Sequence, residues 1–127
     1  MVKPNKHGVL CGSGVERVQV CQNGAARASI KLAQNAETGK WGYGLDADWG
    51  GCAVGGGGFG EPIFTQKCTF DSREDALAAA ERALKARVMT TLLNRRKWGG
   101  ACGPRVLRDL KTIMNSISNK QQRRLFS

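Results

Sequence analysis

The sequence predicts an α+β fold in which an antiparallel sheet of about four strands is covered by one long helix, with a second amphipathic helix near the C-terminus. Alternating apolar and polar residues occupy the first part of the chain, and two stretches with helical periodicity follow at residues 71–97 and 104–118. A chain of 127 residues has room for one domain with a modest core. The expected organisation is a flexible arm, a single domain and a basic tail, at residues 1–14, 15–118 and 119–127.

A β-hairpin is predicted over residues 15–33. The dipeptide Asn23-Gly24 readily supplies the two positive φ angles of a type I′ turn, and alternating residues flank it on both sides. In the third predicted strand, aromatic residues alternate with Gly42 and Gly44. Glycine at alternate positions of a strand often marks a place where another backbone, a bulky side chain or a ligand lies close.

The segment from Gly50 to Pro62 holds seven glycines. Three of them, Gly55, Gly57 and Gly60, match the GxGxxG pattern of a dinucleotide-binding loop, but such a loop must open a helix. Here a fourth strand is predicted to follow, at residues 63–70. We therefore expect a loop between strands that can become ordered on a partner, and no nucleotide binding.

The long helix is predicted to begin at a capping box. Asp71 with Glu74, or Ser72 with Asp75, has the required spacing. The apolar stripe that would cover the sheet consists of Leu77, Ala80, Leu84, Val88 and Leu92. Gly99-Gly100 ends this helix, and the second one begins after Pro104, where a first helical turn tolerates proline.

The formal net charge of +10 is concentrated in the second half of the chain. Residues 1–71 carry seven Lys or Arg against six Asp or Glu, and from Asn94 onward nine basic residues stand against one acidic residue. A phosphate-bearing or otherwise acidic partner is therefore the first expectation, and a solvated basic face without a partner is the alternative. The expected contact residues are Arg95, Arg96, Lys97, Arg105, Arg108, Lys111, Arg123 and Arg124.

The chain carries no pattern typical of catalysis, so we expect no enzymatic activity, no metal and no cofactor. Its only histidine, His7, lies in the predicted arm, and Asp46 and Asp48 share a strand face without a third metal ligand. Five cysteines without a CxxC pair are typical of reduced thiols. No run approaches the roughly 18 apolar residues of a membrane span, and the start does not resemble a signal peptide, so the expected location is the cytoplasm.

The segment FDSREDALAAAERALKAR resembles the β-β-β-α core of double-stranded-RNA-binding domains and HicB-type antitoxins, in which a Ser- or Thr-capped turn opens a helix with an alanine-rich inner face. The matching residues are Phe70, Ser72, Glu74, Ala76, Ala79, Ala80 and Leu84. Unlike the RNA-binding family, this chain has no helix before its strands, and it has Arg73 and Glu74 where that family has a phosphate-contacting lysine pair. Unlike the HicB family, it contains the glycine loop. In overall character it resembles accessory proteins of phages and plasmids.

Two functions agree with these features. The first is non-enzymatic binding of nucleic acid through the C-terminal cationic residues, with Trp98 able to stack on a base. The second is inhibition of a host nucleic-acid-targeting complex, as by an anti-CRISPR or other anti-defence protein that blocks its nucleic-acid groove or an acidic patch. Trp49, Phe59 and Trp98 would then anchor the contact. The sequence leaves open DNA, RNA or protein as the partner, and a homodimer through a sheet edge.

Overall fold

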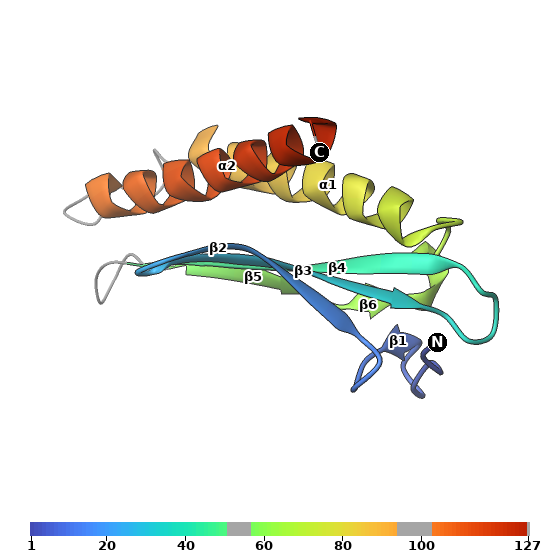
Figure 1. Ribbon diagram of the computed structural model, residues 1–127. Coiled ribbons are helices and arrows are strands. Elements are labelled where there is room, and N and C mark those ends of the chain that lie inside the picture. Colours follow the sequence, from blue (N-terminus) through green and yellow to red (C-terminus); the bar gives the residue numbers. More distant parts are fainter. Residues whose placement is uncertain (51–56, 94–102, 127) are drawn as a thin grey trace.

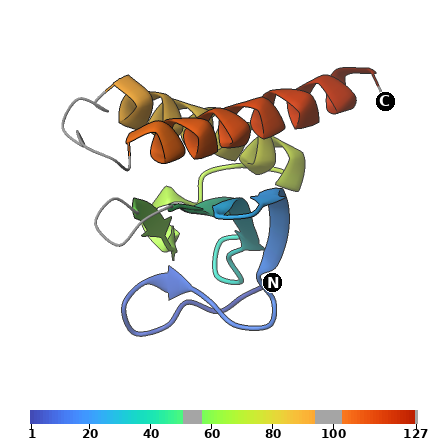
Figure 2. The same cartoon turned by 90° about the vertical axis from the view of Figure 1, so that its left-hand side faces the viewer.

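The computed structural model describes residues 1–50, 57–93 and 103–126. A four-stranded antiparallel sheet forms one layer, and two helices lie side by side over one of its faces (Figure 1). The N-terminal segment lies on the opposite side of the sheet, as the view along the strands also shows (Figure 2). The predicted α+β class is therefore confirmed.

The main sheet has the strand order β2-β3-β4-β5. Its strands are β2 (Glu16–Asn23), β3 (Ala26–Gln34), β4 (Trp41–Trp49) and β5 (Gly57–Glu61). Two short strands, β1 (Val9–Leu10) and β6 (Ile63–Phe64), pair with each other in a second sheet. The helices are η1 (Thr65–Lys67), α1 (Arg73–Leu93) and α2 (Gly103–Phe126). None of the helices in the described ranges is long and apolar enough to cross a membrane.

The predicted hairpin forms between β2 and β3, but its turn lies one residue further along the chain. Asn23 pairs with Ala26, so Gly24 and Ala25 are the two central residues. Gly24 has a φ of 61°, whereas Ala25 keeps a negative φ. Glycine at the first central position is typical of a type II′ turn, so the type I′ prediction at Asn23-Gly24 was wrong.

The fourth strand of the main sheet is β5 and not the predicted strand at residues 63–70. β5 pairs with β4 from Leu45 to Trp49. Within residues 63–70, β6 covers only two residues, a 3-10 turn follows, and Phe70 then forms an isolated bridge with Trp41. Part of the predicted glycine loop is thus a strand, while residues 51–56 lie outside the described ranges.

The N-terminal residues 1–14 pack against the sheet and do not form the flexible arm that the sequence predicted. Val2 and Leu10 are buried in a second apolar cluster with Ile63 and other residues. The side-chain oxygen of Asn5 accepts hydrogen bonds from two backbone N–H groups of the same segment, at 2.9 and 3.1 Å. Burial of these aliphatic side chains contributes to holding the segment against the sheet, in opposition to the entropy cost of ordering it.

Gly42 and Gly44 lie beneath the segment that contains β6. A Cβ atom at Gly42 would lie 2.5 Å from the Cys68 sulfur, and one at Gly44 would overlap the backbone oxygen of Glu61. The predicted close approach of another chain segment at these alternate glycines is therefore confirmed. This contact covers one end of the sheet face that points away from the helices.

The long helix is capped by the second of the two predicted residue pairs. The Ser72 hydroxyl oxygen accepts a hydrogen bond from the backbone N–H of Asp75 at 3.1 Å. Asp71 instead pairs with Lys40, and this contact lowers the pKa of the Asp71 carboxyl. The predicted stripe faces the sheet, with Leu84 and Val88 fully buried.

The second helix continues to Phe126, whereas the sequence predicted an end near Ser118 and a separate basic tail. Residues 119–124 are mostly Lys, Gln and Arg, which favour helix even where no apolar periodicity marks it. Four apolar residues, Val106, Leu110, Ile113 and Ile117, are buried where α2 packs on β2 and β3.

Candidate nucleic-acid interface

The polar side of α2 is the surface on which predicted cationic residues appear. An α-helix repeats every 3.6 residues, so residues three or four apart share a face. The residues opposite the buried stripe are exposed, and we call them the outer face of α2: Arg108, Lys111, Asn115, Ser118 and Asn119. α2 lies in the helix layer on one side of the sheet (Figure 2), and the exposure of these five residues places this face toward solvent.

Asp109 is the only acidic residue after Asn94, and it points inward. Its side chain is 6% exposed, and its Oδ2 accepts a hydrogen bond from the backbone N–H of Gly50 at 3.2 Å. The neighbouring Arg108 side chain is 73% exposed, and its Nε lies 3.9 Å from the Asp109 carboxylate. The carboxylate therefore ties α2 to the end of β4 and leaves the outer face without a negative charge.

The predicted cationic residues fall into three groups. Arg108 and Lys111 are exposed on the same face of α2, and Lys111 makes no ion pair with any residue that the structure describes. Arg95, Arg96 and Lys97 lie outside the described ranges, and so does Trp98. Arg105, Arg123 and Arg124 lie within α2, but their side chains are outside the described part of the structure.

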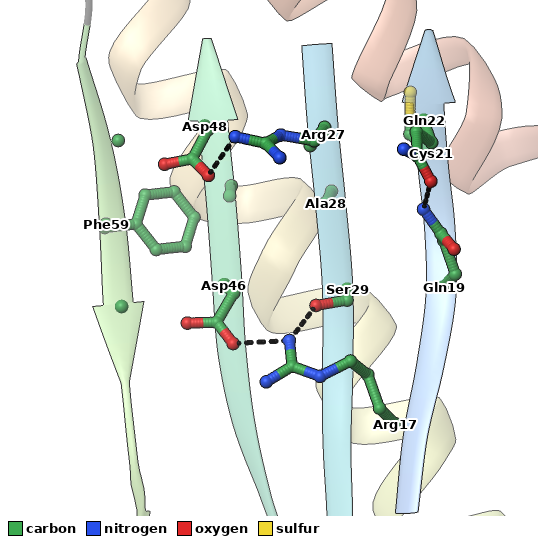
Figure 3. A pocket seen from close by; sticks show the side chains of 13 residues that line it. Arg17, Gln19, Cys21, Gln22, Arg27, Ala28, Ser29, Asp46, Asp48 and Phe59 are labelled. Carbon is green, nitrogen blue, oxygen red and sulfur yellow. Dashed lines mark hydrogen bonds and ion pairs between the residues drawn. The ribbon is translucent and has the colours of Figure 1, made fainter. Parts of the chain in front are cut away.

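A second polar surface lies on the face of the sheet that the helices leave open. It is a groove of about 670 Å³ lined by residues of β2, β3, β4 and β5 (Figure 3). The Arg17 guanidinium donates hydrogen bonds to Ser29 at 2.8 Å and to Asp46 at 2.9 Å. Lys31 lies 3.5 Å from the same carboxylate, and Arg27 lies 3.6 Å from Asp48. The charged groups of the groove are thus paired with one another.

Close neighbours on β4 account for two of the glycines of β5. A Cβ atom at Gly58 would lie 2.6 Å from the backbone oxygen of Ala47 and 2.7 Å from Oδ1 of Asp48, and one at Gly60 would lie 3.1 Å from Oδ1 of Asp46. The backbone of β4 cannot move aside as a side chain can, so the contact at Gly58 is the one that most requires glycine. Asp46 and Asp48 face basic side chains here, and the described residues contain no group of three or more potential metal ligands.

Most acidic residues outside α2 lie within 4 Å of a basic side chain. The pairs are Glu16 and Glu74 with Arg73, Asp46 with Arg17 and Lys31, Asp48 with Arg27, Glu61 with Lys67 and Arg87, and Asp71 with Lys40. The bond from Arg73 lowers the pKa of Glu16 and raises the pKa of Arg73 itself. Many of the basic side chains of the strands and α1 are therefore paired with carboxylates, whereas Lys111 of α2 makes no ion pair with a described residue.

Two of the aromatic residues predicted as interface anchors belong to the core side of the sheet. Trp49 is 6% exposed and packs in the main core. Phe59 is half-buried, with its ring centroid 6.0 Å from that of Trp49 and 3.9 Å from the guanidinium carbon of Arg87. Trp49 therefore does not form the exposed anchor that the sequence suggested, and Phe59 is covered by Arg87.

Three polar residues of the outer face were not singled out from the sequence. Asn115, Ser118 and Asn119 continue the line of Arg108 and Lys111 at spacings of three and four residues, which is the signal that would have found them. No family model matches the chain, and neither a curated protein nor a solved structure matches it.

Proposed function

We propose that the protein binds nucleic acid, without catalysing a reaction, through the cationic outer face of α2. The observation that supports this proposal is the separation of charge within α2. Asp109 is turned into the protein, while Arg108 and Lys111 are exposed to solvent. Lys111 makes no ion pair with a described residue, and the only described carboxylate near Arg108 is the buried Asp109, 3.9 Å away. Both cations are therefore suited to phosphate oxygens, which supply most of the affinity in non-specific binding.

The sheet groove is a poorer surface for a polyanion. Its two arginines already bond to Asp46 and Asp48, and these carboxylates would repel phosphate. Binding there would require the ion pairs to open before any new contact formed. On the outer face of α2, Lys111 makes no ion pair with a described residue, and Arg108 has only the long 3.9 Å contact with Asp109 to give up.

A salt titration tests the proposal. Each phosphate contact with duplex DNA lowers the logarithm of the association constant by about 0.9 per tenfold rise in salt. The variant Arg108→Gln/Lys111→Gln should bind a labelled duplex more weakly, and its salt slope should be smaller by roughly 1.8 if each residue contacts one phosphate. Fluorescence anisotropy between about 50 and 200 mM salt measures both quantities.

The matched control is Lys3→Gln/Lys6→Gln, which removes the same charge from the exposed N-terminal segment on the other side of the sheet. This control should change the slope much less. Equal slopes for the two variants, or no binding of the wild-type protein to any duplex, RNA or single strand at low salt, would contradict the proposal.

A second candidate function is binding to a nucleic-acid-handling protein complex, as an inhibitor would. It is favoured by Met89 and Leu93, which are large apolar residues of α1 with 41% and 74% exposure. They are four residues apart and so share one helix face. Exposed apolar pairs often mark protein contacts. Capture of a protein by the wild-type chain after nuclease treatment, together with no affinity for oligonucleotides, would favour this candidate.

A further inference from the structure

The middle of the outer face of α2 carries hydrogen-bonding groups that no residue in the described ranges uses. Asn115, Ser118 and Asn119 are exposed, and their side chains make no hydrogen bond with any other described residue. Other hydroxyl groups of the same helix behave differently. Thr112 donates to the backbone oxygen of Arg108 at 2.9 Å, and Ser116 donates to that of Thr112 at 3.0 Å. The outer-face groups are therefore available to a ligand.

Helix propensity alone would favour other residue types at these three positions. Asn and Ser are weaker helix formers than Ala, Lys, Glu or Gln, because their short polar side chains compete for backbone hydrogen bonds in other conformations. At exposed interior positions of a helix they gain no packing in return. A binding role accounts for their presence on the same line as Arg108 and Lys111.

The chemistry of this line matches base edges in duplex DNA. An asparagine amide can form two hydrogen bonds with adenine, and a serine hydroxyl can bond to several bases. Asn115 and Asn119 are one helical turn apart, or about 6 Å along the axis, which is close to two base-pair steps of about 3.4 Å. Arg108 and Lys111 precede them on the same face, where they can contact the phosphates that flank the groove.

The shape of α2 favours DNA over RNA. A helix is about 10 to 12 Å across, and the major groove of B-form DNA is about 12 Å wide. The major groove of A-form RNA is deep and narrow, and side chains of a helix cannot read it. α2 packs on the edge strand β2, with α1 as its helical neighbour, and its outer face lies on the outside of the layer (Figures 1 and 2).

We infer that α2 is a recognition helix that enters the major groove of duplex DNA, where Asn115 and Asn119 select the sequence. This inference rests on the proposed function, since it assigns a substrate class and specificity residues to the same face. Arg108 and Lys111 set affinity and salt dependence, and the two asparagines set the preference among sequences.

Selection from a randomised duplex library, followed by competition binding, tests the inference. The wild-type protein should enrich a short adenine-containing motif and should bind duplex DNA more tightly than duplex RNA of the same sequence. The ratio of affinities for the motif and for a scrambled duplex measures this preference. In Asn115→Ala/Asn119→Ala this ratio should fall by about 5- to 150-fold for each bidentate contact removed. Alanine favours helix, so circular dichroism should show that this variant is folded.

The outcomes separate the two claims. Equal binding of duplex DNA and duplex RNA, with no enriched motif, would overturn the recognition helix and leave non-specific nucleic-acid binding intact. The recognition helix would also be overturned if Asn115→Ala/Asn119→Ala lowered the affinity for the motif and for the scrambled duplex by the same factor. Failure of the wild-type protein to bind any oligonucleotide at low salt would overturn the proposed function as well.

Discussion

The open face of the sheet and the outer face of α2 are both polar and both carry exposed basic residues, but they differ in what stands beside each charge. In the sheet groove, Arg17 and Arg27 face Asp46 and Asp48. On α2 the one acidic residue, Asp109, is buried on another side of the helix. The comparison teaches that a count of basic residues does not locate a surface for a polyanion. The position of the carboxylates decides which positive charges are available.

The largest expected effect on stability comes from Asp109. In Asp109→Ala the backbone N–H of Gly50 loses its acceptor, so the free energy of unfolding should fall by about 1 to 3 kcal/mol. The matched control is Glu37→Ala, which removes the same charge from an exposed residue and should change stability by less than about 0.5 kcal/mol. Urea unfolding measures both. Equal effects would mean that the inward position of Asp109 is not a structural requirement.

A somewhat smaller effect is expected in the groove, where Gly58 lies close to the backbone of β4. A Cβ atom in Gly58→Ala would lie 2.6 Å from the Ala47 backbone oxygen and 2.7 Å from Asp48, so the variant should be less stable by about 1 to 2 kcal/mol. In Gly50→Ala the nearest atom would be 3.9 Å away, and this variant serves as the control. The melting temperature of Gly58→Ala should be the lower of the two. If Gly58→Ala is as stable as Gly50→Ala, the close approach of β4 does not explain the glycine at this position.

The smallest expected effect on stability comes from the ion pair between Glu16 of β2 and Arg73 of α1. The pKa of Glu16 is lowered by its hydrogen bond from Arg73, so the folded state holds the proton less tightly than the unfolded state does. The pair therefore stabilises the fold above the ordinary pKa of 4.5, and this contribution is lost as the pH falls through the lower folded value. Glu16→Gln should reduce the urea midpoint near neutral pH and match wild type in strong acid. A difference that persists in acid would contradict an ion-pair origin.

The sequence predicted the elements whose signals are local. Ser72 and Asp75 mark the start of α1, and the aliphatic stripe of that helix predicts its buried face. The strand β5 was missed because glycines have no side chains to show alternation, and their role depends on close contacts with β4. The packing of Val2 and Leu10 was missed because single apolar residues in a polar segment have no period.

The candidate site could be predicted only in part, for a similar reason. The run of basic residues after Asn94 is visible in the sequence, and the helical period places Arg108 and Lys111 together. The inward direction of Asp109 depends on Gly50, which lies far away in the chain. The pairing of Arg17 and Arg27 with β4 likewise depends on strand register. Sequence patterns report the presence of charges, while tertiary contacts decide which of them remain available.

The most direct test of the central claim compares the two surfaces in one assay. The salt dependence of duplex binding is measured for Arg108→Gln/Lys111→Gln and for Arg17→Gln/Arg27→Gln, which remove equal charge from α2 and from the groove. The account predicts a smaller slope and weaker binding for the α2 variant, and a slope close to wild type for the groove variant. Equal losses in the two variants, or a larger loss in the groove variant, would contradict it.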